Sequence, residues 1–279
     1  MGDFMRRIFS GKTSRATLAM AASLGVISPA LAADPAVSET NLKITTTAGT
    51  VDGDSAWTGV AGLTVPLAPA WGAQAEAGAM STDGDTSYGL AGHVFKRDPD
   101  SYLAGVFLAY SSEDELDIEA TRLGAEAEFY MGQVTLLLKG GYQFSDVLDD
   151  TAFAEAELHW YASDNFRLAG GFSVQEDATL GHADAEWLVG GQSLPGLALR
   201  ASAYVGDDDY DSIMGGITWY FGSDASLKDR HRRQDPDSAL FNLFHAVQDA
   251  KDGLCEQAAP LVLKTVSPQT CTIAPPPPT

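Results

Sequence analysis

Cysteine and basic residues are scarce in this sequence. Two cysteines in 279 residues exclude a disulfide-dense scaffold and the cysteine-rich zinc modules. Lysine and arginine together number 17, against 38 aspartates and glutamates, so the formal net charge is −21. A chain this acidic is a poor match for the phosphate backbone of a nucleic acid, and we predict no such partner. The mean hydropathy of −0.06 excludes a chain filled with helical membrane spans.

The N-terminal residues 1–32 have the pattern of an export signal. Basic residues precede a small or apolar run over 16–27, and Ala30-Leu31-Ala32 fits a small-x-small cleavage site. The run is too short for a membrane anchor, which needs about 20 apolar residues. We therefore predict a signal peptide over 1–32 and a mature chain that starts at Ala33.

A period of two dominates residues 41–221, as expected of β-strands. In 152–160, Glu155, Glu157 and His159 share one face, and alanine, leucine and tryptophan take the other. Turn residues separate segments of about ten residues. Twelve segments follow one another, at roughly 41–51, 55–67, 71–81, 86–96, 101–112, 116–131, 133–144, 151–162, 165–176, 182–192, 196–206 and 212–221.

Three features distinguish these segments from the strands of a soluble sandwich. Their lengths are near the 9–11 residues with which a tilted strand crosses a bilayer. The odd-numbered connectors are acidic, whereas the even-numbered ones are mostly tight turns, so an up-and-down meander sorts them onto two rims. Aromatic residues stand near the segment ends, as at the interfaces of transmembrane barrels: Trp57, Trp71, Tyr102, Tyr130, Trp160, Phe166, Trp187, Trp219 and Phe221.

The last segment, 212–221, ends in Ile-Thr-Trp-Tyr-Phe and resembles the closing strand of bacterial outer-membrane β-barrels. The stretch 226–236 is similar to the basic linker after the last strand in alphaproteobacterial barrel proteins of unestablished activity. The resemblance implies a porin-like barrel in the outer membrane of a Gram-negative bacterium, inserted by the barrel-assembly machinery. Outer-membrane barrels commonly end at the closing phenylalanine, whereas 58 residues follow Phe221 here.

We predict an all-β fold, namely a closed antiparallel up-and-down barrel. We expect 12 strands, within a range of 10 to 12. Lipid offers no partners to an edge strand, so the sheet must close, and an even strand count puts both ends of the barrel at the periplasmic rim. The domains are a signal peptide (1–32), a periplasmic lead-in (33–40), the barrel (41–221) and a periplasmic extension (222–279).

The polar strand faces are expected to line the lumen. Rings of charged side chains select ions in channels, but the same groups can also fill a barrel with ion pairs. Both alternatives stay open for a barrel of twelve strands, and no catalytic residue is expected among these groups. The lumen candidates are Lys43, Glu76, His93, Arg122, Glu126, Glu128, Lys139, Glu155, Glu157, His159, Arg167, Asp184, Glu186 and Arg200.

The acidic connectors predict a diffuse rim that collects divalent cations beside lipopolysaccharide phosphates and enriches cations at the mouth. No specific metal site and no cofactor are expected. The rim candidates are Asp52, Asp54, Asp83, Asp85, Asp207, Asp209 and Asp211.

The extension predicts a basic linker, an amphipathic helix over about 238–252, a disulfide between Cys255 and Cys271, and a proline-rich end. One amphipathic helix cannot bury itself, so it must dock on another surface. Docking at the periplasmic mouth is the preferred alternative over the inner leaflet or an unknown periplasmic partner, because the lumen is acidic and the linker basic.

Three functions are compatible with this sequence. The leading one is a small diffusion channel for small polar or cationic solutes, since residues 33–221 carry 7 basic and 30 acidic residues. The second is a non-conducting structural or surface-interaction barrel. The third is an outer-membrane lipid-modifying enzyme, for which His182 has no serine on its own strand face.

Overall fold

The computed structural model describes residues 34–148, 150–175, 178–189, 194–207, 210–222 and 224–258. They form twelve strands and two helices. The strands are β1 (Asn41–Val51), β2 (Asp54–Ala68), β3 (Trp71–Thr82), β4 (Asp85–Asp98), β5 (Tyr102–Glu113), β6 (Glu119–Met131), β7 (Val134–Ser145), β8 (Thr151–Ser163), β9 (Phe166–Gln175), β10 (Ala178–Leu188), β11 (Leu197–Val205) and β12 (Asp211–Tyr220). The helices are α1 (Leu227–Arg233) and α2 (Leu240–Ala258).

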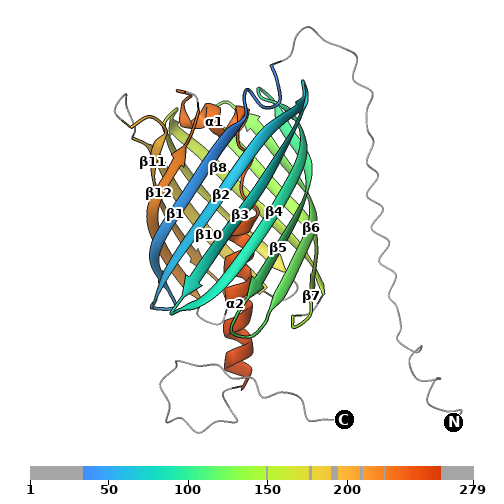
Figure 1. Ribbon diagram of the computed structural model, residues 1–279, viewed down its shortest axis with the longest axis vertical. Helices are drawn as coiled ribbons and strands as arrows, with labels where there is room; N and C mark the ends of the chain where they lie inside the picture. Colours follow the sequence, from blue (N-terminus) through green and yellow to red (C-terminus); the bar gives the residue numbers. More distant parts are fainter. Residues whose placement is uncertain are drawn as a thin grey trace, which may run out of the picture. The chain divides into compact units, whose positions relative to one another are not determined.

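Each strand pairs with its sequence neighbours, and β1 pairs with β12 to close the barrel (Figure 1). The closing ladder is antiparallel and runs from the Lys43–Tyr220 pair to the Val51–Ser212 pair. Every strand therefore has two partners, which leaves no sheet edge to satisfy. The predicted fold, a closed antiparallel barrel of twelve strands, is confirmed.

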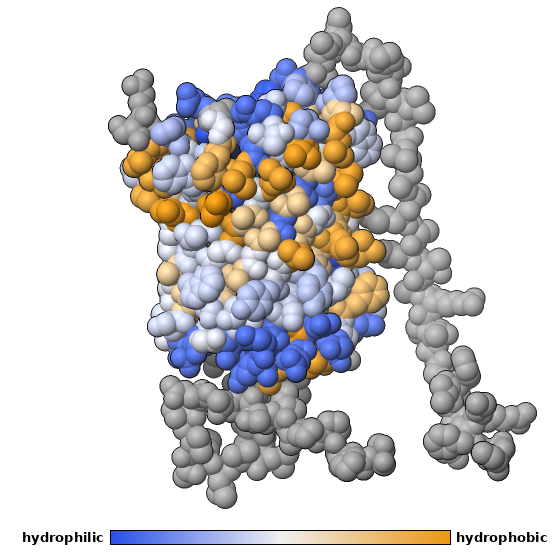
Figure 2. All heavy atoms as spheres, in the orientation of Figure 1, coloured by the Kyte–Doolittle hydropathy of each residue, from blue (hydrophilic) through white to orange (hydrophobic). Residues whose placement is uncertain are grey.

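The two faces of the barrel wall differ in polarity. Leucine, valine, isoleucine and aromatic side chains lie on the outside, and Figure 2 shows them as an apolar band between hydrophilic ends. Trp57, Trp160 and Trp187 are each about half exposed on this outer face, at 49%, 50% and 53%. This is the surface that a bilayer requires of a barrel.

Tyr130 corrects one sequence prediction. Expected among the outer aromatics, it is buried inside the barrel, and its hydroxyl donates to Glu128 at 3.0 Å. The physical reason is strand parity, because Tyr130 is two residues from the inward-facing Glu128 and so shares its face. The strand β10 begins four residues earlier than predicted. That shift is even, so the inward face of β10 remained correctly predicted.

Two of the acidic connectors are tight hairpin turns. Asp52 and Asp83 have φ values of 51° and 50°, and the glycines that follow them, Gly53 and Gly84, have φ values of 83° and 101°. Two consecutive left-handed residues are the pattern of a type I′ turn, which Asp-Gly favours. Asp52 and Asp83 thus have a conformational role in addition to their charge.

The two helices correct the expectation for the extension. Residues 226–236 were predicted as a linker, but they contain α1, whose N-cap Ser226 accepts a hydrogen bond from the backbone N–H of Asp229. The helix α2 lies inside the barrel instead of docking at its mouth, and Figure 1 shows it running along the lumen. Among the described residues, no helix is both long and apolar enough to cross a membrane.

Candidate functional site: a lumen filled by the C-terminal helix

The helix α1 closes one mouth of the barrel, at the rim formed by the even-numbered connectors. The backbone N–H of Lys228 donates to the carbonyl of Asp164, between β8 and β9, at 3.0 Å. Arg232 donates to the carbonyls of Gly132 and Val134 at 2.8 Å each. Positive side chains of α1 therefore satisfy backbone carbonyls of the short turns at this rim.

His231 joins α1 to the barrel wall through two tyrosines. The Tyr161 hydroxyl lies 3.0 Å from Nδ1 of His231, and the Tyr220 hydroxyl lies 2.9 Å from Nε2. Tyr220 donates its own proton to Glu186 at 2.7 Å, so it accepts from the imidazole. This arrangement fits a neutral imidazole protonated at Nε2, and burial lowers the pKa of His231 to about 4.

Between the helices, residues 235–239 cross into the lumen and exchange hydrogen bonds with the wall. We call residues 235–251 the plug. Lys139 lies 2.7 Å from the Asp237 carboxylate and donates to the Ser238 carbonyl at 2.8 Å. Glu76 accepts from the Ser238 hydroxyl and from the backbone N–H of Ala239, both at 3.1 Å. The backbone N–H of Ala239 stands just ahead of the first turn of α2, and without Glu76 this N–H would lack a partner.

Asn242 on α2 meets a polar ring of the wall. Arg122 donates to the Asn242 side chain at 2.8 Å and to Gln175 at 2.7 Å. The amide of Asn242 in turn donates to Ser173 at 3.1 Å. Two strands, β6 and β9, thus converge on one plug residue, and Arg122, which is only 3% exposed, is satisfied by uncharged partners.

Below this ring, toward the acidic rim, apolar side chains of α2 pack against apolar side chains of the wall. The apolar stripe of α2, Leu240, Leu243, Phe244 and Val247, is at most 1% exposed. We call the wall residues that surround it the collar: Val60, Met80, Ala91, Phe107, Phe153, Leu180 and Met214. Burial of a leucine or phenylalanine side chain contributes about 1.5–3 kcal/mol, so the collar holds α2 by the hydrophobic effect.

Gly89 lets α2 approach the wall closely. A Cβ atom at this position would lie 2.8 Å from the ring of Phe244 and 3.0 Å from Leu240. Van der Waals contact between carbon atoms needs about 3.5–4.0 Å. The small residue on β4 therefore matches the largest side chain of the plug.

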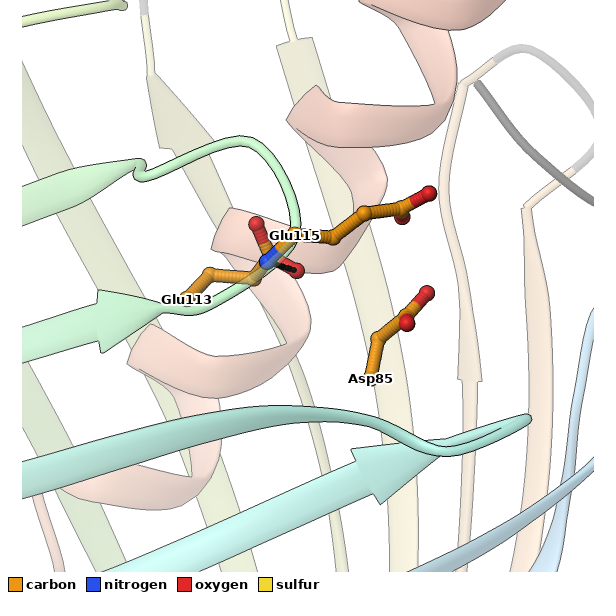
Figure 3. Close-up of side chains that lie close together, drawn as sticks. All are labelled: Asp85, Glu113 and Glu115. Carbon is orange, nitrogen blue, oxygen red and sulfur yellow. Dashed lines mark hydrogen bonds between the residues drawn. The ribbon is translucent and has the colours of Figure 1, made fainter. Parts of the chain in front are cut away.

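At the acidic rim, Lys251 makes the last contacts between the plug and the wall. Its ammonium group lies 2.5 Å from Glu115 and 3.1 Å from both Asp85 and Glu113. Figure 3 shows these three carboxyl groups gathered beside α2. Burial lowers the pKa of Lys251, but the carboxylates more than offset this and keep it above its ordinary value.

The structure places all fourteen predicted lumen residues inside the barrel. Twelve of them are buried, Lys43 donates to the carbonyl of Pro236 at 3.0 Å, and Arg200 lies over the ring of Phe241 at 4.5 Å. Their part in solute selection stays a prediction. The collar, Lys251 and the α1 contacts were not predicted.

Several wall groups pair with one another. Arg167 forms a close ion pair with Asp184, which also lies 2.8 Å from Arg200. His93 lies 2.9 Å from Glu126. Such pairs match the second alternative for the lumen, a barrel interior that is filled by ion pairs.

Glu157 is the centre of a second group in the wall. It lies 2.7 Å from His159 and 2.6 Å from His182. Glu157 contacts Nε2 of His182, and Nδ1 of His182 has no hydrogen-bond partner among the described residues, so the histidine–serine pair that a lipid hydrolase needs is not formed here. Glu155, Glu157 and Asp237 also bring carboxylate oxygens within 4.8 Å of one another, with Lys139 supplying a positive charge beside them.

Two of the rim aspartates accept hydrogen bonds from the backbone of neighbouring hairpins. Asp52 accepts the backbone N–H of Asp211 at 2.8 Å, and Asp207 accepts that of Thr179 at 2.7 Å. These carboxylates therefore stabilise adjacent connectors, and divalent-cation binding by the rim stays a prediction. Asp209, the signal peptide, the side chain of Cys255 and the whole of Cys271, with the predicted disulfide, lie outside the described residues.

Little space remains between plug and wall. One cavity of about 40 Å³ lies near His159, His231 and Asp237, and another of about 20 Å³ lies near Glu157 and His182. A water molecule needs about 10–15 Å³. Each of these two cavities has room for a few waters at most, so plug and wall fill most of the lumen around them.

A closed barrel with an apolar outer band and a charged, occupied lumen has the architecture of an outer-membrane β-barrel. No protein-family model matches the sequence, and no curated protein matches it either. Among solved structures, the chain is similar to the KdgM porin in complex with disordered oligogalacturonate, with a TM-score of 0.51 and 5% sequence identity. That alignment covers 66% of this chain and 99% of the porin.

A second KdgM porin structure gives a TM-score of 0.50 with the same identity and coverage. The NanC porin gives 0.49 at 9% identity and covers 64% of this chain and 98% of its own. At such identities the likeness establishes the fold alone.

Proposed function

We propose that this protein is an outer-membrane barrel of a Gram-negative bacterium that passes small polar or cationic solutes only when the plug leaves its lumen. One observation carries the proposal. The lumen is occupied by a helix from the C-terminal part of the chain, which packs among inward-facing side chains of the wall. Removal of that segment would leave an opening lined by charged groups.

Cation preference follows from the charge of the barrel segment. Residues 33–221 carry 30 acidic and 7 basic residues. Acidic connectors at the mouth raise the local cation concentration, and the effect is largest at low salt because screening is weakest there. The same proposal includes an alphaproteobacterial source and insertion by the barrel-assembly machinery. It also includes a surrounding lipid layer in which divalent cations bridge lipopolysaccharide.

A non-conducting structural barrel is the second candidate, and the collar favours it. Without α2, the collar residues would face the lumen, and an apolar constriction of this kind resists wetting. The lipid-modifying enzyme receives no support from His182, whose free ring nitrogen has no serine partner among the described residues.

Single-channel recording in planar bilayers tests the proposal. The full chain is expected to be silent or to open rarely. A variant that stops after Gly222 lacks α1 and the plug, and it is expected to conduct cations, with stronger preference at low salt. Heat-modifiable gel mobility shows in both proteins that the barrel is folded. A folded but silent truncated barrel would overturn the channel and leave the structural barrel.

A further inference from the structure

We propose that the barrel carries the chain beyond α2 through its own lumen to the cell surface, so that the residues after Lys251 are presented there. The inference rests on the proposed outer-membrane placement. It adds a function to the barrel, namely the presentation of its own C-terminal segment. It also replaces the predicted periplasmic position of the C-terminal end.

The start of the described chain lies at the rim of even-numbered connectors. The backbone N–H of Ala36 donates to the carbonyl of Pro69, and that of Ser38 donates to the carbonyl of Arg233, both at 2.8 Å. Arg233 also pairs with Asp34 at 2.5 Å and with Asp100 at 2.9 Å. Lead-in, α1 and short turns thus share one rim.

The plug then contacts the wall at successive levels toward the other rim. Asp237 meets Lys139, Asn242 meets Arg122, and Lys251 meets the carboxylates of the odd-numbered connectors. Twelve helical residues from Leu240 to Lys251 span about 18 Å at 1.5 Å each. The chain that entered at the lead-in rim therefore reaches the acidic rim.

The backbone of α2 continues beyond that rim. The helix extends seven residues past Lys251, to Ala258, which adds about 10 Å. Figure 1 shows its end outside the strands. Residues that follow Ala258 thus begin on the side of the membrane opposite the lead-in.

The lead-in rim faces the periplasm in this placement. An exported chain reaches the outer membrane from the periplasm, and the lead-in with an even number of strands stays on that side. The acidic rim then faces outward. The collar and the polar contacts make the lumen complementary to α2 from Leu240 to Lys251.

Labelling with a membrane-impermeant maleimide tests the route. Cys255→Ser leaves Cys271 as the single tail thiol. In a Cys255→Ser, Cys271→Ser background, Ser55→Cys marks the acidic rim and Ser101→Cys marks the lead-in rim, both at exposed positions. Intact cells are expected to label Cys271 and Ser55→Cys, whereas Ser101→Cys labels only after the outer membrane is permeabilised.

Protection of Cys271 on intact cells, while Ser55→Cys labels, overturns the inference and leaves the outer-membrane barrel in place. Protection of both, or labelling of Ser101→Cys on intact cells, overturns the proposed placement itself.

A charge in the collar tests whether the lumen is the route. Leu243→Asp is expected to abolish labelling of Cys271 on intact cells, because the buried carboxylate has no partner among apolar groups. Leu243→Ile is the matched control and retains labelling. In the Cys255→Ser, Cys271→Ser background, Ser55→Cys reports the membrane insertion of each Leu243 variant separately. Unchanged labelling of Cys271 in an inserted Leu243→Asp barrel overturns the route through the lumen.

Discussion

The ammonium nitrogen of Lys251 lies 2.5 Å from Oε2 of Glu115, at the rim opposite to α1. Asp85 and Glu113 complete the surroundings of the amine, each at 3.1 Å. The plug is therefore held at both ends by charge, through the arginines of α1 at one rim and through one lysine at the other. The lysine side chain is 6% exposed, so water screens this contact weakly.

Lys251→Met is expected to loosen the end of the plug at the acidic rim. Hydrogen bonds to charged groups contribute about 1.5–3 kcal/mol, and the three carboxylates would also be left to repel one another. The expected result is more frequent opening in single-channel recordings. Lys251→Arg keeps the charge and should stay closed. Equal open probabilities of Lys251→Met and the unaltered chain would contradict a restraining role for Lys251.

Gly89→Leu is expected to displace α2 from the wall. The new side chain would occupy the space of the Phe244 ring, which already lies 2.8 Å from the position of a Cβ atom. Overpacking of this kind costs about 1–3 kcal/mol. The control is Gly92→Leu on the same strand, which faces outward. Increased proteolysis or conductance is expected of Gly89→Leu alone, and the same response of both variants would implicate the wall instead.

The docking of α1 is expected to weaken as the pH falls from about 6.5 to 4. Burial lowers the pKa of His231 to about 4, so an undocked imidazole takes up a proton first. The neutral ring stabilises the docked state of α1 fully above pH 6.5. This stabilisation is lost as the pH falls toward 4, and the loss is at most about 3 kcal/mol. Hydrogen-exchange protection factors of α1 amides measure this change. His231→Gln should flatten the profile, and a profile that is already flat in the unaltered chain would refute the assignment.

Ion selectivity of the truncated barrel is expected to follow the lumen charge. In the variant that stops after Gly222, Glu126→Gln or Glu157→Gln should reduce cation preference and move the reversal potential toward zero. Gln74→Glu, at another inward position, should have the opposite effect. Changes of the same sign for removal and addition of a carboxylate would show that the lumen wall does not set selectivity.

The strands and their faces were predictable from the sequence because a strand has a fixed period. Alternation of Glu155, Glu157 and His159 with small and apolar residues fixed their inward position, and the structure agrees. The prediction is wrong at Tyr130, because the tendency of aromatics near strand ends to lie on the outer face conflicts there with the parity set by Glu128.

The filled lumen was not predictable from the same pattern. The stripe of Leu240, Leu243 and Phe244 indicates a helix that needs an apolar surface, but it does not indicate which one. Phe107 and Phe153 supply part of that surface from strands far away in the sequence. Their inward position followed from parity, yet their approach to α2 depends on the closure of the barrel in three dimensions.

Closure of β1 against β12 has a consequence for the order of assembly. The helix lies within a ring whose seam is a ladder of backbone hydrogen bonds between these strands. A helix inside an intact ring cannot leave sideways, and it can move only lengthwise. Either the nineteen-residue helix is in place before the seam forms, or it threads about 28 Å of its length into a finished ring. Slow steps in folding should therefore belong to the seam or to the threading of the helix, and not to the individual hairpins.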